Sequence, residues 1–359
     1  FWRFSTVGRA VGHGRQEGAF PKMRVGVNYA WHNYAWDFGL PPRRDSGTPW
    51  GPRAAFLATL QDDLRALRSL GLFAVRWFLL GDGTTYGMDE ARPHRDASAS
   101  EQWRFDNCPE LSPEFLSDFT ALLAACAAAD VQLVPSLIDF HFCFPGLVIP
   151  GSAGVVKCGR SDVLVDPRKR LRFFDRVLAP LLEVAAGFRD TIYAVELINE
   201  PEWCTRQPGL SMDQFDAKKT VPRDDMRLFL REGAMRINAA GFRSTVGFAK
   251  YETVALWDAV DLGLSLHQFH YYGEPDVVPR QTYSPDWPLI VGEFATAVHR
   301  PWPELGASQD VLSRLRLLSA KGYPEVFLWS RNRAEETASE PAVDWSERTR
   351  QLIAEFTRG

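Results

Sequence analysis

The chain has 359 residues, of which 45% are hydrophobic and 24% are charged, as is typical of a globular protein. Its net charge is −4 and its acidic and basic residues are interspersed, so the sequence indicates neither a nucleic-acid partner nor binding to an anionic membrane. No apolar run approaches the roughly 18–20 residues that span a bilayer, so we expect no membrane span. The oligomeric state is left open.

Residues 1–23 contain glycine and arginine but no hydrophobic periodicity, and we expect them to form an irregular N-terminal arm. This stretch has no apolar core of the kind found in a signal peptide. The sequence therefore leaves open whether the protein is cytoplasmic or is secreted after processing. We expect residues 24–359 to form a single domain.

Eight short runs rich in apolar and β-branched residues predict buried strands. In chain order they are 24–31, 73–80, 131–139, 192–200, 244–248, 263–272, 288–294 and 325–330. Helical periodicity predicts helices between most of them, at 52–70, 113–129, 167–188, 223–240 and 308–320. A last helix is expected to begin at Asp344, with Glu347 completing a capping box. Strands that alternate with helices imply a parallel sheet.

The loops differ in length according to their direction. Helix-to-strand turns are short, as at Gly71 and Asp130, whereas the strand-to-helix loops at 81–111 and 140–165 are long. A (β/α)8 TIM barrel builds its active site from the strand-to-helix loops at one face, so this asymmetry predicts that α/β fold. The alternative is an open doubly wound sheet, which usually has a glycine-rich first turn. Here the first strand runs into Trp31-His-Asn-Tyr instead.

The cysteines predict neither a metal site nor a cofactor. There are five of them and no C-x-x-C pair, so a zinc or iron–sulfur site is not indicated. Cys143 and Cys158 bracket one loop. They would pair in an oxidising compartment and stay as free thiols in a reducing one, and both possibilities remain open.

Two of the predicted strands end on a glutamate. The fourth closes with Asn199, Glu200 and Pro201, and proline ends a strand because it has no N–H for the ladder. Glu293, 93 residues later, ends the seventh strand. Strands four and seven lie on roughly opposite sides of a barrel mouth, so these two carboxylates are expected to face each other. Facing carboxylates, one protonated and one ionised, can cleave a glycosidic bond as acid/base and nucleophile.

Charged and aromatic side chains also stand at other strand ends. Arg76 carries a permanent charge that would keep Glu293 ionised, although an ordinary ion pair with Asp62, Asp63 or another acid is the alternative. His270 and Tyr272 are two residues apart, so both side chains point to one face of their strand.

In chain order, these strand-end residues resemble glycoside hydrolase family 5, whose members are retaining (β/α)8-barrel glycosidases of clan A. The matching positions are Arg76, Asp139 with His141, Asn199-Glu200-Pro201, His270 with Tyr272, Glu293 and Trp329. The resemblance spans residues 24 to about 332 and requires no metal or cofactor. It implies that Glu200 is the general acid/base and that Glu293 is the nucleophile of a glycoside hydrolase.

The neighbours of these glutamates also have supporting roles on physical grounds. Tyr272 is expected to donate to Glu293, and His270 to orient Glu200. Asn199 is expected to bond the sugar 2-OH, an interaction that strengthens in the transition state.

Further residues are expected around the sugar itself. Trp329 would form the floor of the −1 sugar site, with plain packing as the alternative. His141 is expected to bind or support the substrate, and a buried, satisfied histidine is the alternative for both His141 and His270. Glu202 and Trp203 are expected to extend towards the leaving group. Glu196 should point into the barrel and be paired, without a catalytic role.

The expected partner is a β-linked oligosaccharide or polysaccharide. The wording Val-Glu-Leu-x-Asn-Glu-Pro at 195–201 is similar to a motif of mannanases, which favours β-mannan or manno-oligosaccharides, with β-glucan next. The long loops at 81–111 and 140–165 follow adjacent strands and should wall one side of the cleft. Two alternatives remain open: a sugar-binding pseudoenzyme, and an enzyme of a different class on the same barrel.

Overall fold

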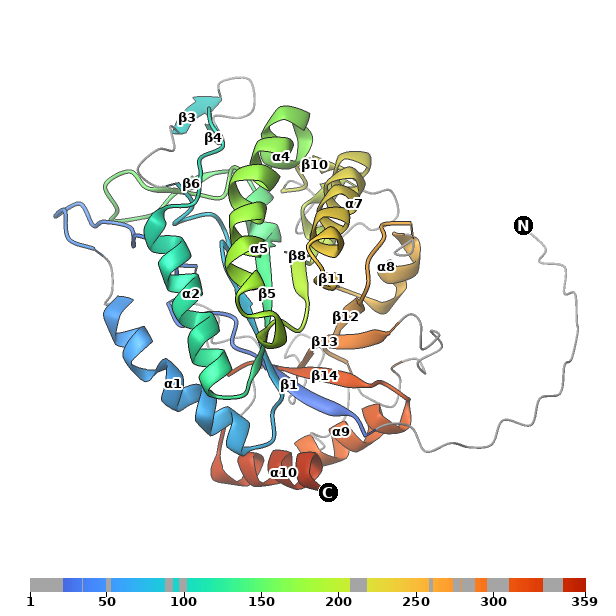
Figure 1. Cartoon of the computed structure of the whole chain (residues 1–359). Coiled ribbons are helices and arrows are strands. Elements are labelled where there is room, and N and C mark those ends of the chain that lie inside the picture. The colour runs from blue at the N-terminus through green and yellow to red at the C-terminus, as the bar shows by residue number, and fades with distance from the viewer. Residues whose placement is uncertain are drawn as a thin grey trace, which may run out of the picture.

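The computed structural model describes residues 22–33, 35–49, 53–87, 93–96, 102–206, 218–257, 261–273, 278, 288–295, 310–331 and 345–359 (Figure 1). Nearly all of the predicted N-terminal arm, residues 1–21, lies outside these ranges.

Eight parallel strands close into a barrel, as the sequence predicts. They are β1 (Arg24–Asn28), β2 (Ala74–Phe78), β5 (Gln132–Asp139), β8 (Val195–Asn199), β11 (Ser244–Phe248), β12 (His267–Tyr271), β13 (Leu289–Ala295) and β14 (Glu325–Trp329). Each strand pairs with the next in this order, and β14 returns to pair with β1. The (β/α)8 prediction is therefore confirmed, and the open doubly wound sheet is wrong.

Helices lie outside the strands (Figure 1). They are α1 (Arg53–Ser69), α2 (Pro113–Ala128), α3 (Asp162–Val165), α4 (Pro167–Phe173), α5 (Ala179–Ala186), α7 (Arg223–Ala239), α8 (Tyr251–Leu256), α9 (Val311–Ala320) and α10 (Glu347–Arg358). The Ser112 hydroxyl caps α2 by accepting from the Phe115 N–H at 3.2 Å. The cap predicted for the last helix is wrong, because Ser346 caps α10 by accepting from the Thr349 N–H.

The barrel interior changes character along its axis. At the amino ends of the strands it is filled by apolar side chains, among them Tyr193, Leu266 and Phe327. Towards the carboxyl ends the inward-facing positions become polar and charged, including Asn28, Arg76, Ser136, Glu196 and Gln268. This polar layer lies directly beneath the mouth, where the barrel can support a charged site.

The two long loops contain short hairpins that sequence periodicity did not predict. The first holds β3 (Pro93–Asp96) and β4 (Gln102–Phe105), and the second holds β6 (Leu147–Val148) and β7 (Val156–Lys157). A bridge between Trp103 and Gly146 joins the two loops. A Cβ at Gly146 would lie 2.4 Å from the Trp103 carbonyl oxygen, so this contact requires a glycine.

All five cysteines are free and buried, so the Cys143–Cys158 disulfide is not formed and the free-thiol alternative holds. Among the described residues, no helix is long and apolar enough to cross a membrane.

Gly233 on α7 packs closely against β8, the strand that carries Asn199. A Cβ there would lie 2.5 Å from Leu197 Cδ2 and 3.3 Å from Phe174 Cε1. Alanine is preferred over glycine within a helix by about 1 kcal/mol. We nevertheless expect Gly233→Ala to lower the free energy of unfolding by about 1–3 kcal/mol, because the core is overpacked.

Urea denaturation measures this change. Gly187→Ala at the end of α5 is the matched control, because its Cβ would meet only the Val184 carbonyl oxygen, at 3.5 Å. A Gly233→Ala variant as stable as the wild type would contradict the close packing of α7 on β8.

Candidate active site

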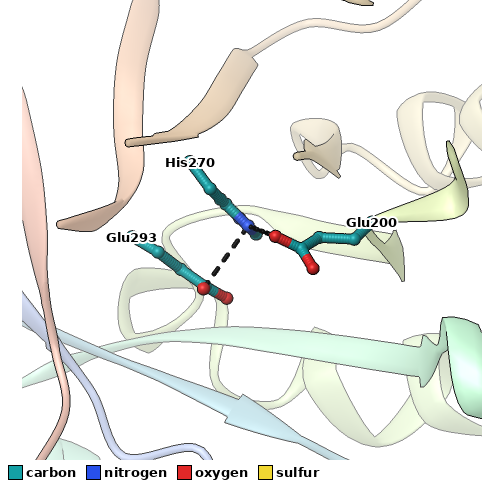
Figure 2. Close-up of side chains that lie close together, drawn as sticks. All are labelled: Glu200, His270 and Glu293. Carbon is teal, nitrogen blue, oxygen red and sulfur yellow. Dashed lines mark hydrogen bonds and ion pairs between the residues drawn. The ribbon is translucent and has the colours of Figure 1, made fainter. Parts of the chain in front are cut away.

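Glu200 and Glu293 come from opposite sides of the barrel mouth and point towards each other (Figure 2). Glu200 directly follows β8 and has left-handed backbone angles, φ 45° and ψ 57°. Such angles are strained for a residue other than glycine. Its N–H donates to the Gly247 carbonyl oxygen at 2.6 Å, which holds the turn in place. Glu293 lies within β13 and is 3% exposed.

His270 on β12 lies between the two carboxylates. Its Nδ1 is 2.8 Å from Glu200 Oε1 and 3.4 Å from Glu293 Oε2 (Figure 2). Burial lowers the pKa of His270 to about 4, so the ring is neutral near pH 7 and carries one N–H. Nε2 is buried and has no hydrogen-bond partner among the described residues. The proton therefore belongs on Nδ1, which donates to Glu200 Oε1, while Glu293 Oε2 lies nearby without a hydrogen bond to it.

Two glycines make room for the His270 ring. A Cβ at Gly247 on β11 would lie 3.1 Å from His270 Nε2, and a Cβ at Gly292 on β13 would lie 3.3 Å from His270 Cδ2. Neither glycine has a positive φ, so their role is space and not backbone conformation. The ring is fixed between two neighbouring strands.

Glu200 lies in surroundings that favour its protonated form. Burial raises the pKa of Glu200 to about 7, and a hydrogen bond from the Trp203 indole, 2.7 Å from Nε1 to Oε2, works against that rise. No cationic side chain is in hydrogen-bond contact with this carboxyl group among the residues described. Such a group can hold a proton and release it near neutral pH.

Glu293 has different neighbours. Arg76 Nη1 donates to its Oε1 at 2.7 Å, and the Tyr272 hydroxyl donates to its Oε2. Burial raises the pKa of Glu293, while His270 and Arg76 act against that rise. Because a permanent cation touches only Glu293, this carboxyl group is the one of the pair that ionises first.

Arg76 contacts other side chains besides the expected partner, Glu293. It pairs with neither Asp62 nor Asp63, and besides Glu293 it forms a double hydrogen bond with Glu196. Asn28 Oδ1 and Asn199 Oδ1 accept its remaining N–H groups, at 2.8 and 2.7 Å. Burial would lower the pKa of Arg76, but Glu196 and Glu293 raise it above its usual value, so the guanidinium stays charged.

A second chain of hydrogen bonds connects His141 to this group. Its Nδ1 bonds to Asp139 Oδ1, and Asp139 Oδ2 accepts from Asn199 Nδ2 at 2.8 Å. Burial would lower the pKa of His141, but the charge of Asp139 raises it overall. The His141 side chain is 39% exposed, so it faces the mouth.

Trp329 is held at the mouth by packing against other aromatic side chains. It is 7% exposed and lies in an aromatic cluster with Phe78 and Trp31, against which Tyr272 also packs. The Trp31 and Trp329 ring centroids are 6.0 Å apart at an interplanar angle of 76°. The structure thus brings all nine candidate residues to the same end of the barrel, seven of them joined directly by hydrogen bonds.

Some functional groups were missed or misplaced by sequence reasoning. Glu196 is buried and paired as expected, but its partner was not predicted, and Asn28 and Gln268 were not singled out. The sequence feature that could have identified Glu196, Asn28 and Gln268 is a polar residue at an inward-facing position of an otherwise apolar strand. Glu202 does not reach towards a leaving group: it is 5% exposed and accepts from the Ala249 N–H at 2.9 Å and from Thr253.

Comparison with protein-family models gives no match, and no curated protein matches the sequence. Solved structures do match. A β-mannanase from the blue mussel Mytilus edulis has a TM-score of 0.63 at 20% identity, covering 94% of this chain and 92% of the mussel protein. An endo-1,4-β-mannanase from Eisenia fetida has a TM-score of 0.65 at 17% identity, covering 95% of this chain and 92% of that chain.

An exo-β-1,4-mannosidase from Opitutaceae bacterium strain TAV5 has a TM-score of 0.54 at 16% identity, covering 98% of this chain and 62% of that chain. At these identities the similarity establishes a shared fold. The (β/α)8-barrel fold that the resemblance implies is confirmed.

The Trp203 indole favours the ionised form of Glu200, so Trp203→Phe should raise the pKa of Glu200 above about 7. We expect a rise of about one unit, since the lost bond is to a group that carries charge. Carbon-13 NMR titration of labelled glutamate carboxyls measures it, with Glu200→Gln to assign the signal. Trp103→Phe, on the hairpin strand β4, is the control, and an unchanged pKa in Trp203→Phe would contradict the contact.

Proposed function

We propose that this protein is a retaining β-glycosidase that hydrolyses β-mannan or manno-oligosaccharides, with Glu200 as acid/base and Glu293 as nucleophile. The observation that carries the proposal is the pair of carboxylates in unlike surroundings, with the neutral His270 ring between them. The facing oxygen atoms of Glu200 and Glu293 and the His270 nitrogen all lie within 4.8 Å of one another. Retaining glycosidases separate their carboxyl groups by about 5–5.5 Å, whereas inverting enzymes leave about 6.5–9.5 Å for a water.

In the first step, the Glu293 carboxylate attacks the anomeric carbon while the proton on Glu200 moves to the glycosidic oxygen. The bond from the anomeric carbon to that oxygen breaks, and the sugar becomes esterified to Glu293. Arg76 and Tyr272 hold the attacking carboxylate, and the raised pKa of Glu200, about 7, lets it arrive with its proton.

In the second step, Glu200 is ionised and takes a proton from water, whose oxygen attacks the anomeric carbon. The bond to Glu293 breaks and the carboxylate is restored. The His270 N–H donates to Glu200 and can stabilise the carboxylate that Glu200 becomes after the first step.

The choice of mannan rests on two observations. The solved structures with the same fold include proteins described as a β-mannanase, an endo-1,4-β-mannanase and an exo-β-1,4-mannosidase. The sequence of residues 195–201 is similar to a mannanase motif. β-Glucan is the next candidate. Hydrolysis of β-mannan, manno-oligosaccharides, β-glucan and aryl β-glycosides, measured side by side, tests this choice, and no turnover of any of them would favour the sugar-binding pseudoenzyme.

A metal-dependent hydrolase is the competing function, because Glu200, His270 and Glu293 could together hold a metal ion. A metal ligand must be unprotonated. A metal on Nδ1 would move the His270 proton to Nε2, which has no acceptor among the described residues. Dialysis against a chelator discriminates: the glycosidase mechanism predicts full activity afterwards, and loss of activity restored by a divalent cation would favour the metal enzyme.

Two variants test the assigned roles. Glu293→Ala should lower turnover of every substrate by at least about 10⁴-fold, because no covalent intermediate can form. Glu200→Ala should retain the first step for aryl glycosides whose leaving groups need no proton, and added azide should restore the second step by forming a β-glycosyl azide. Proton NMR of the first sugar released by the wild type should show the β-anomer, and the α-anomer would rule out retention.

The joined loops at 81–111 and 140–165 suggest a cleft with few sugar subsites. We therefore expect action on oligosaccharides or near chain ends. Soluble β-mannan should lose viscosity slowly relative to the reducing sugar released, and short products should dominate from the start. A rapid viscosity drop with long products at random would favour an open, endo-acting cleft.

A further inference from the structure

Arg76 divides its five N–H groups unequally between two glutamates. Glu196 receives two of them, at 2.8 Å from Nε to Oε2 and 2.6 Å from Nη2 to Oε1. Glu293 receives one, at 2.7 Å from Nη1. The planar fork of a guanidinium suits the double bond to one carboxylate, so Glu196 fixes the plane and direction of Arg76.

Glu196 is surrounded by donors. Besides the two from Arg76, the Ser136 hydroxyl donates to Oε1 at 2.6 Å and Gln268 Nε2 donates to Oε2 at 2.5 Å. Four donors around a fully buried carboxyl group are the coordination of an ionised carboxylate. Gly247 keeps this space open, because a Cβ there would lie 3.2 Å from Glu196 Oε1.

The charges at this point do not balance. One guanidinium faces two carboxylates, so the group carries a net negative charge whenever Glu293 is ionised. The other titratable groups facing Glu293 or Arg76 among the described residues are Glu200, His270 and Tyr272, with Asp139 reached through Asn199. None of them supplies a second permanent cation, so the attraction of Arg76 for Glu293 is weakened by Glu196.

We propose that Glu196 is a positioning residue for the nucleophile: it aims Arg76 at Glu293 and, by sharing its charge, keeps the Glu293 carboxylate from being held too tightly to attack. This inference rests on the proposed function. An undivided guanidinium would stabilise the ionised Glu293 in the ground state, and stabilisation that is lost in the transition state slows the reaction.

Glu196→Gln removes the charge and keeps the size. It should lower the pKa of Glu293 by about one unit, because Arg76 then acts on one carboxylate alone. Carbon-13 NMR titration of Glu293, assigned with Glu293→Gln, measures this without any substrate. The acidic limb of the pH–rate profile should move to lower pH by the same amount, and kcat should fall more than KM changes.

Ser136→Ala is the second variant. It is needed because Glu196→Gln places an amide N–H₂ against hydrogen-bond donors, and this variant could therefore fail to fold. Loss of the Ser136 hydroxyl leaves the Glu196 charge less stabilised, so the pKa of Glu293 should rise. Glu202→Gln removes another buried carboxyl group that does not touch Arg76, and it should leave the pKa of Glu293 and the acidic limb unmoved.

The outcomes separate this inference from the proposed function. Opposite shifts of the Glu293 pKa in Glu196→Gln and Ser136→Ala support the role of Glu196. An unchanged Glu293 pKa in folded Glu196→Gln, or in Ser136→Ala where Glu196→Gln does not fold, overturns it. A wild type that shows the expected titration but hydrolyses no glycoside would instead overturn the proposed function.

Discussion

One buried guanidinium connects the strands that carry the site. Arg76 on β2 reaches Asn28 on β1, Glu196 and Asn199 on β8, and Glu293 on β13. These strands are far apart in the sequence, and an uncompensated charge inside a barrel would be costly. The polar layer is stable only because each hydrogen of Arg76 has an acceptor, and that requirement fixes where the nucleophile candidate lies.

The difference between Glu200 and Glu293 follows from the same arrangement. Both carboxyl groups are buried enough to raise their pKa values, and both touch the same neutral imidazole. Only Glu293 touches the cation, and only Glu200 touches the Trp203 indole. Environments that separate the protonation of two carboxylates allow one to act as an acid while the other attacks. The asymmetry thus arises from which strand end each glutamate occupies.

The fold and the facing glutamates could be predicted because both depend on local features. Apolar runs mark the strands, and Pro201 marks the end of the strand before Glu200, so strand order alone places Glu200 opposite Glu293. Which charged side chains pair with one another could not be predicted. Arg76 had acidic residues available nearby in sequence, but it pairs with Glu196, 120 positions away, because both point inward at the same level of the barrel. Glu202 likewise turns inward towards Thr253, a contact that only the folded loops define.

The apolar filling at the amino end of the barrel bears on how the site exchanges protons with solvent. Tyr193, Leu266 and Phe327 form an apolar cluster below the charged layer. The Glu200 side chain is 15% exposed at the carboxyl end of the barrel, where water can reach it. Under the proposed mechanism, the water that attacks in the second step would also return the proton to Glu200, so the acid form would be restored before the sugar leaves.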